Sequence, residues 1–243
     1  MSIDHSQTYK KRSLRNLPHR LRLNAVLLLL DSRMPSRNIR FADFGCSNGY
    51  ITDLVANRYS VKDAYGFDCE ADHLAAARER YPGIQFGPTD LNDPTPQGIF
   101  DLVTCFETLE HVGKPENALR KLLASCKEGG RVIITVPIET GLLGLSKFLA
   151  KVIVYRRRYR SDLDEVFDQK SVGRYICWLV LNKDISTFRD VRTRWGSHFG
   201  FDYRIVDRFL HGQKVVYDSW RSGTTRFYVI EKQTKTLTSE QSR

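Results

Sequence analysis

Short apolar runs alternate with amphipathic stretches between residues 37 and 137, and this alternation predicts strands separated by helices. The expected strands cover residues 38–44, 63–68, 84–87, 100–106 and 131–137. The expected helices cover residues 51–59, 71–81 and 115–130, and the last one ends on Gly129 and Gly130. Alternation of this length indicates a parallel sheet with helices on both faces. The nearly continuous apolar run FDLVTCF at 100–106 is typical of a buried parallel strand.

Two flanking regions extend this pattern. Residues 18–31 predict a leading helix, and residues 214–220 and 225–232 predict an antiparallel hairpin around the turn RSGT. The expected fold class is therefore α/β, a Rossmann-like, seven-stranded, mostly parallel sheet with helices on both faces and an antiparallel C-terminal strand. We expect a single domain over residues 1–234 and a disordered polar tail at 235–243.

The composition is that of a soluble globular protein, with 41% hydrophobic and 27% charged residues among 243. The longest apolar run, AVLLLL, is far shorter than the ~20 residues of a membrane-spanning helix. The polar N-terminus lacks the apolar core of a signal sequence. We therefore expect a cytoplasmic protein, with peripheral attachment at the inner face of the membrane left open. Five cysteines without a C-x-x-C pair predict reduced thiols and no zinc site.

The turn after the first expected strand, FADFGCSNGY, carries the clearest chemical signal. Gly45 and Gly49 have the spacing G-x-x-x-G, which lacks the middle glycine of a dinucleotide site, and no G-K-[ST] motif for a triphosphate is present. Asp43 would repel a phosphate and attract an ammonium group, directly or through water. A ligand with an amino-acid head, a nucleoside and no phosphate meets both conditions, and S-adenosylmethionine is such a ligand.

The ends of the next strands supply further polar groups. Asp68 follows Gly49 by 19 residues and could hold both ribose hydroxyls, although enzymes that use NAD place an acid similarly. Asp90 could accept a hydrogen bond from the adenine amino group, with the Leu91 backbone nearby. Asp43 and Asp90 could instead cap the following helix and a turn. The predicted cofactor-binding residues are Asp43, Gly45, Cys46, Asn48, Gly49, Asp68, Cys69, Asp90, Leu91 and Phe106.

As a set, these positions resemble the class I S-adenosylmethionine-dependent methyltransferases over residues 37–137. The resemblance implies that Gly45 and Gly49 pack against the methionine moiety, that Asp68 holds the ribose and that Asp90 holds the adenine. It also implies a cofactor-binding core at 37–137 and an acceptor lid at 138–200. The segment Cys46-Ser47-Asn48 departs from the more usual glycine-rich filling of this turn.

The segment FETLEHV supplies the catalytic candidates Glu107, Glu110 and His111. An oxygen acceptor usually has a proton to lose, and His111 titrates near neutral pH. The same three residues could hold a divalent metal ion, or His111 could be purely structural. With the strand before it, the segment resembles the ubiquinone-biosynthesis O-methyltransferases. Its E-x-x-E-H part also resembles the small-RNA 3′-terminal 2′-O-methyltransferases, where a further histidine joins the metal; His198 or His211 could serve here.

Residues 141–160 concentrate the basic charge, with two lysines, four arginines and no acid. Apolar positions 142, 145, 148, 149, 152 and 153 fall on one helical face, and Lys147 and Lys151 fall on the other. This pattern is typical of an interfacial helix on an anionic membrane. The ubiquinone-biosynthesis enzymes carry a membrane-associated insertion at this place. A core-facing helix and an RNA-phosphate patch are the alternatives.

We therefore expect O-methylation of a small-molecule or lipid-linked acceptor (isoprenoid or glycan) at a membrane surface, with peripheral contact through 141–160. Nucleic acid is the less favoured partner, and the rival enzymatic hypothesis is a metal-dependent RNA 2′-O-methyltransferase. A catalytically inactive, methyltransferase-like binding module is the non-enzymatic rival.

Overall fold

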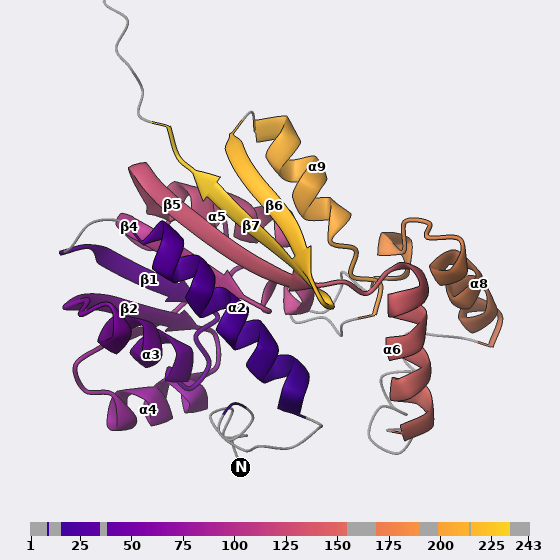
Figure 1. The fold of residues 1–243 in the computed structure, drawn as a ribbon, viewed down its shortest axis with the longest axis horizontal. Coiled ribbons are helices and arrows are strands. Elements are labelled where there is room, and N and C mark those ends of the chain that lie inside the picture. Colours follow the sequence, from indigo (N-terminus) through magenta and orange to yellow (C-terminus); the bar gives the residue numbers. More distant parts are fainter. Residues whose placement is uncertain are drawn as a thin grey trace, which may run out of the picture.

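The computed structural model describes residues 9, 16–34, 38–154, 169–189, 199–213 and 215–233. Its centre is a seven-stranded sheet in the order β3-β2-β1-β4-β5-β7-β6 (Figure 1). Strands β1 to β5 run parallel, β7 is antiparallel to β5, and β6 is antiparallel to β7. The strands are β1 Arg40–Phe44, β2 Asp63–Asp68, β3 Gln85–Pro88, β4 Phe100–Phe106, β5 Cys126–Pro137, β6 Val216–Ser222 and β7 Thr225–Glu231. The predicted fold class is confirmed.

Helices connect the strands and cover the sheet. They are α2 Leu17–Arg33, α3 Tyr50–Arg58, α4 Ala71–Arg80, α5 Pro115–Ser125, α6 Gly141–Val154, α8 Gln169–Val180 and α9 Arg204–Gln213, with the short helices η2 Leu109–His111 and η3 Ser186–Phe188. The sequence pattern anticipated all the strands and α2 to α5 within about two residues, except at the junction of α5 and β5. Helix α9, which packs on α5, was not predicted.

Alternate residues of the central strands point to opposite faces of the sheet, as the two-residue strand period requires. Phe41 and Leu102 pack with α2 and α3 on one face, in a cluster that includes Val26. Ala42 and Val103 pack with α5 and α9 on the other face. Burial on both faces explains why β4 is nearly continuously apolar. The parallel pairing of β1 with β2 and β4 brings the carboxyl ends of these strands to one edge.

The predicted boundary between the helix and the strand at 115–137 is wrong. Helix α5 ends at Ser125 and β5 begins at Cys126, so Gly129 and Gly130 lie within the strand. A Cβ atom on Gly130 would lie 2.8 Å from the carbonyl oxygen of Asp101. The glycine pair therefore permits a close approach of two backbones, rather than ending the helix.

Helices α6 and α8 stand beyond the end of β5, apart from the two helical layers (Figure 1). They share a small apolar cluster formed by Phe148, Tyr175, Leu179, Ile185 and Phe199. They fall within the predicted lid at 138–200, whose limits remain a prediction. In the part of the chain that the structure describes, no helix is long and apolar enough to cross a membrane.

The orientation of α6 differs from the sequence prediction. Its apolar positions do not share one environment, since Phe148 is buried while Leu142 and Ile153 are each 74% exposed. Lys147 and Lys151, expected on the solvent face, both turn inward and pair with Glu139. A helical projection gives the two faces of a helix but not which face meets the protein. The arginines at 156–160 and the tail at 235–243 lie outside the described residues.

All five cysteines are free thiols, as predicted. Cys46, Cys105 and Cys126 are buried, and Cys69 is half-buried. Cys177 is exposed on α8.

Candidate functional site

The turn between β1 and α3 depends on its two glycines. Gly45 and Gly49 both have φ of 77°, a left-handed conformation that strains other residues. A Cβ atom would lie 2.3 Å from the Thr108 hydroxyl oxygen at Gly45 and 2.6 Å from the Phe86 ring at Gly49. The turn is therefore pressed between the loop after β4 and strand β3. Cys46 and Asn48, also predicted to bind the cofactor, are buried within it.

Asp43 lies beneath this turn, at the end of β1. Its two carboxylate oxygens accept hydrogen bonds from the hydroxyls of Thr52 at 2.7 Å and Thr104 at 2.8 Å. Burial raises its pKa to about 6, although both hydrogen bonds act in the opposite direction. Asp43 thus ties β1 to α3 and β4, and its predicted contact with an ammonium group remains untested.

Asp68 faces the turn from the end of β2. Its carboxylate accepts hydrogen bonds from the backbone amide of Ser47 at 2.7 Å and from that of Glu70 at 3.0 Å. One side chain therefore holds the tip of the glycine turn and the start of α4 together. The half-buried Cys69 is adjacent, and burial raises the pKa of its thiol to about 12. That thiol is protonated at neutral pH and is not a nucleophile.

The loop after β3 holds Asp90 and Leu91. The Asp90 carboxylate accepts hydrogen bonds from the backbone amide of Asn92 at 2.9 Å and from its side-chain amide at 3.0 Å, so the turn-capping alternative is realised. Leu91 is buried. The sequence analysis missed Lys121, a buried lysine on α5 that donates a hydrogen bond to the Thr89 hydroxyl at 2.9 Å. Lys121 supports this loop from beneath, and burial lowers its pKa.

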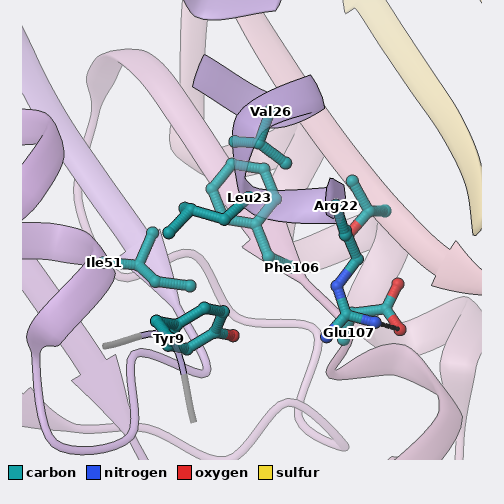
Figure 2. A pocket seen from close by; sticks show the side chains of 8 residues that line it. Tyr9, Arg22, Leu23, Val26, Ile51, Phe106 and Glu107 are labelled. Carbon is teal, nitrogen blue, oxygen red and sulfur yellow. Dashed lines mark hydrogen bonds and ion pairs between the residues drawn. The ribbon is translucent and has the colours of Figure 1, made fainter. Parts of the chain in front are cut away.

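A small pocket lies beside the ends of β4 and β5 (Figure 2). Its lining residues are Tyr9, Arg22, Leu23, Val26, Ile51, Phe106, Glu107 and Thr135. Ile51 follows the glycine turn by two positions, so the turn and this pocket are neighbours. Phe106, predicted to face the cofactor, lines the pocket at the end of β4.

An ion pair spans this pocket. The Arg22 guanidinium donates from Nη1 to Oε2 of Glu107 at 2.7 Å, and both side chains are largely buried. The Tyr9 ring lies beside them (Figure 2) and stacks on Tyr50 with 5.6 Å between the ring centroids. Sequence analysis missed Tyr9 and Arg22. Arg22 could have been found, because it continues the buried stripe of α2 through Val26 and Leu30 at a spacing of four residues.

Glu107 and Glu110 are in unusual environments for carboxyl groups. Glu107 has φ of 48°, a left-handed backbone, and its amide donates to the Thr135 carbonyl at 3.0 Å. Burial raises the pKa of Glu107, against the effect of Arg22. Glu110 is 1% exposed, and burial together with Glu107 raises its pKa well above the ordinary value. Glu110 is therefore buried and not accessible to an acceptor.

The Glu-Glu-His metal site, an alternative left open by the sequence, does not assemble within the described ranges, which contain no group of three His, Cys, Asp or Glu side chains placed to hold a metal ion. His111 is half-exposed at the end of η2. His211 lies in the last turn of α9, and His198 lies outside the described residues. Of the three catalytic candidates, Glu110 is buried, whereas Glu107 and His111 are both partly exposed.

A lid residue holds the loop that carries these groups. Arg189, just after η3, donates from Nη2 to the carbonyl oxygens of Glu110 at 3.0 Å and Leu109 at 3.5 Å. Its guanidinium lies 5.3 Å from the centroid of the Phe201 ring. Burial lowers the pKa of Arg189 to about 10, against the effect of Glu110. The lid and η2 are thus joined through one side chain.

Comparison with known proteins gives one family and one fold. Residues 5–182 match the family described as a methyltransferase domain. The chain is 30% identical over 111 residues to trans-aconitate 2-methyltransferase of Rhizobium etli, covering 45% of this chain and 43% of that protein. It is 34% identical over 99 residues to the enzyme of the same name from Variovorax paradoxus, covering 40% and 38%. The aligned region thus spans less than half of these relatives, and the likeness to ubiquinone-biosynthesis enzymes stays a prediction.

Two solved structures share the fold over nearly the whole chain. Magnesium protoporphyrin IX methyltransferase from Synechocystis, solved with bound SAH, superposes with a TM-score of 0.58 at 14% identity, covering 93% of this chain and 92% of that one. The PH0226 protein of Pyrococcus horikoshii superposes with a TM-score of 0.59 at 16% identity, covering 93% and 96%.

Proposed function

Because the chain belongs to the class I S-adenosylmethionine-dependent methyltransferases, we propose that it transfers a methyl group from that cofactor to an acceptor bound beside Phe106 and Glu107. The observation that carries this proposal is the left-handed Gly45–Gly49 turn, held to Asp68 through the Ser47 amide at the carboxyl ends of the strands. Open α/β sheets bind their ligands at this edge.

Three parts of the edge suit the three parts of the cofactor. The glycine turn offers close backbone approach to the methionine chain. Asp68, the carboxylate at the end of β2, suits the ribose hydroxyls. The Asp90–Leu91 loop suits the adenine, since it follows β3 at the same edge of the sheet.

The amino-acid head of the cofactor carries an ammonium and a carboxylate, and Arg22 with Glu107 offers the complementary pair. In the protein alone the two side chains neutralise each other at 2.7 Å. A zwitterion could bind between them, with its carboxylate on the guanidinium and its ammonium on Glu107. This assignment replaces Asp43 as the primary partner of the ammonium, because both Asp43 oxygens already accept threonine hydroxyls in the buried interior.

The acceptor we favour is a carboxylic acid. The relatives named trans-aconitate 2-methyltransferase point to this class. A carboxylate nucleophile has no proton to lose, so its methylation needs no general base. The site agrees with this, because Glu107 is ion-paired with Arg22 and Glu110 is buried. S-adenosylmethionine supplies an electrophilic methyl group on a sulfonium; the acceptor oxygen forms the new O–C bond as the C–S bond breaks. The protein contributes alignment and exclusion of water.

A lipid-linked acceptor at a membrane surface is the second candidate. The observation in its favour is the outward face of α6, where Leu142 and Ile153 are each 74% exposed and Leu149 is 41% exposed. The basic segment 156–160 follows directly in the sequence.

Calorimetric titration of S-adenosylmethionine tests the cofactor assignment. Asp68→Ala removes the carboxylate that faces the ribose and holds the turn, and we expect binding to weaken at least about 30-fold, the cost of lost charge-assisted hydrogen bonds. Asp72→Ala, which removes an exposed carboxylate on the first turn of α4, is the matched control and should bind as wild type. Unchanged binding by Asp68→Ala would overturn the proposal. Transfer of labelled methyl groups into the acid or lipid fraction of a cell extract then separates the two acceptors.

A further inference from the structure

Helix α6 presents its two lysines inward, while three of its aliphatic side chains, Leu142, Leu149 and Ile153, are exposed. Lys147 Nζ lies 3.1 Å from Oε1 of Glu139 and donates to the Ile138 carbonyl oxygen at 3.0 Å. Lys151 Nζ lies 3.4 Å from Oε2 of the same glutamate. The side chains of Lys147 and Lys151 are only 25% and 21% exposed. Two largely buried ammonium groups therefore share one carboxylate.

This arrangement leaves one positive charge in excess. Desolvating an ammonium group costs free energy that an opposite charge must offset, and Glu139 supplies only one. Lysine side chains are long enough to reach solvent, and a helix with no other task would turn its lysines outward and its leucines inward. Here Leu142 and Ile153 hold the outward positions instead. The inward lysines are therefore placed for a further anion.

The excess charge lies at the acceptor side of the candidate site. Glu139 follows β5 by two residues, at the same edge of the sheet as Glu107. Lys147 lowers the pKa of Glu107 and Glu139 raises it, so these charges act on the carboxylate that lines the pocket. Lys151 also lies 5.5 Å from the centroid of the Phe199 ring, in the lid cluster. An anion bound by the two lysines would lie between the lid and the pocket.

We propose that Lys147 and Lys151 form the anion-binding site of the acceptor, and that Glu139 occupies it until an acceptor binds. This proposal rests on the proposed methyl transfer and names the acceptor class as one with anionic oxygens. The anion could be a second carboxylate of a small acid or the phosphate of a lipid-linked acceptor. Either would exchange with Glu139 on the lysines and leave the ion-paired Glu107 and Arg22 to the cofactor.

Calorimetry on the protein loaded with SAH tests this site with two probes, tricarballylate for carboxylates and pyrophosphate for phosphates. We expect wild type to bind one of them, and Lys147→Met/Lys151→Met to bind it at least about tenfold more weakly, as expected for loss of a charge-assisted contact. Lys62→Met/Lys183→Met makes the same change in net charge at two exposed lysines and should bind the probe as wild type. Loss of tricarballylate binding identifies a small acid, and loss of pyrophosphate binding identifies a phosphate.

A second variant keeps the test sound if the double lysine variant folds poorly. Glu139→Gln removes the competing carboxylate and keeps the volume of the side chain, so the same probe should bind several-fold more tightly. Wild type that binds neither probe, or a lysine variant that binds as wild type does, overturns the anion site. Because SAH binding is measured first, its loss in wild type would count against the methyltransferase proposal itself, whereas intact SAH binding without probe binding would count against the anion site alone.

Discussion

Asp43 is a carboxyl group in the interior, and its chemistry follows from its neighbours rather than from its place in a motif. The sequence predicts an acid two residues before a glycine turn, but the two threonines that satisfy it come from α3 and β4. Contacts between residues so far apart in sequence depend on the register of β1 against β4, which no local pattern records. The pairing of Arg22 with Glu107 could not be predicted for a similar reason, since the two residues lie 85 positions apart in the chain.

The raised pKa of Asp43 predicts a specific dependence of stability on pH. The folded protein holds the Asp43 proton up to about pH 6, whereas the unfolded chain releases it near the ordinary value of 3.8. Between these two values the folded state binds more protons, so the contribution of Asp43 to stability falls as pH rises. Asp43→Asn does not titrate, and it should gain up to about 3 kcal/mol relative to wild type between pH 4 and pH 7.

Urea unfolding of wild type and Asp43→Asn at pH 4, 5, 6 and 7 measures this difference. A free-energy difference between the two proteins that stays constant with pH would contradict the assignment of a raised pKa to Asp43.

Arg22 predicts a difference between two cofactor analogues. Arg22→Met removes the guanidinium proposed to bind the methionine carboxylate, so SAH should bind about tenfold to a hundredfold more weakly. Methylthioadenosine lacks the amino-acid head, and its affinity should stay within about twofold. Arg58→Met, which removes an exposed arginine paired with Asp31, is the control. Equal weakening of both analogues would show that Arg22 acts through the fold instead of through the carboxylate.

At the scale of elements, the strands of the central sheet could be predicted because a strand that is buried on both faces requires a continuous run of apolar residues. The end of α5 could not be predicted from the sequence, because a pair of glycines is found both within strands and at the ends of helices. The faces of α6 could be predicted, but their orientation could not, because it depends on Glu139 and on the lid cluster. Glu110 is a catalytic candidate in the sequence, and its burial appears only once η2 packs on α5 and β5.

Arg189 predicts a mechanical link between the lid and η2. Arg189→Met removes the donor to the carbonyls of Leu109 and Glu110, so amides at 109–112 should exchange hydrogen faster, while those of β4 keep their rates. Arg189→Lys retains one charged donor and should restore part of the protection. Hydrogen exchange followed by mass spectrometry measures both segments in one experiment. Equal protection in wild type and Arg189→Met would exclude the link.

In the molecule as a whole, short sequence motifs predict the edge of the sheet that is proposed to bind the cofactor. They do not predict the acceptor region. The turn at 45–49 follows β1, Asp68 ends β2 and Asp90 lies just after β3, so the parallel order of the strands alone brings them to one edge. The acceptor side draws on the loop after β4, α6 and the lid residue Arg189, which meet only in the folded chain. This difference explains why the predicted cofactor class was confirmed while the acceptor remains a proposal.

The outward face of α6 predicts the behaviour of the whole protein on membranes. If it docks on lipid, wild type should float with vesicles that contain phosphatidylglycerol, and replacing Leu142, Leu149 and Ile153 by Ser should reduce the bound fraction several-fold. Replacing Leu17, Leu21 and Leu28 of α2, which are 41%, 59% and 69% exposed, by Ser provides a control of matched chemistry. Wild type that never floats would remove the lipid-linked candidate.

The distribution of the five thiols makes the protein suited to spectroscopic labelling. Cys177 is exposed on α8, whereas Cys46, Cys105 and Cys126 are buried, and the half-buried Cys69 has a pKa of about 12. A maleimide dye reacts with accessible thiolate, so it should attach to Cys177 in the native protein. The natural sequence therefore carries a single reporter position on the lid, and fluorescence from it could follow lid movement in real time without any engineered cysteine.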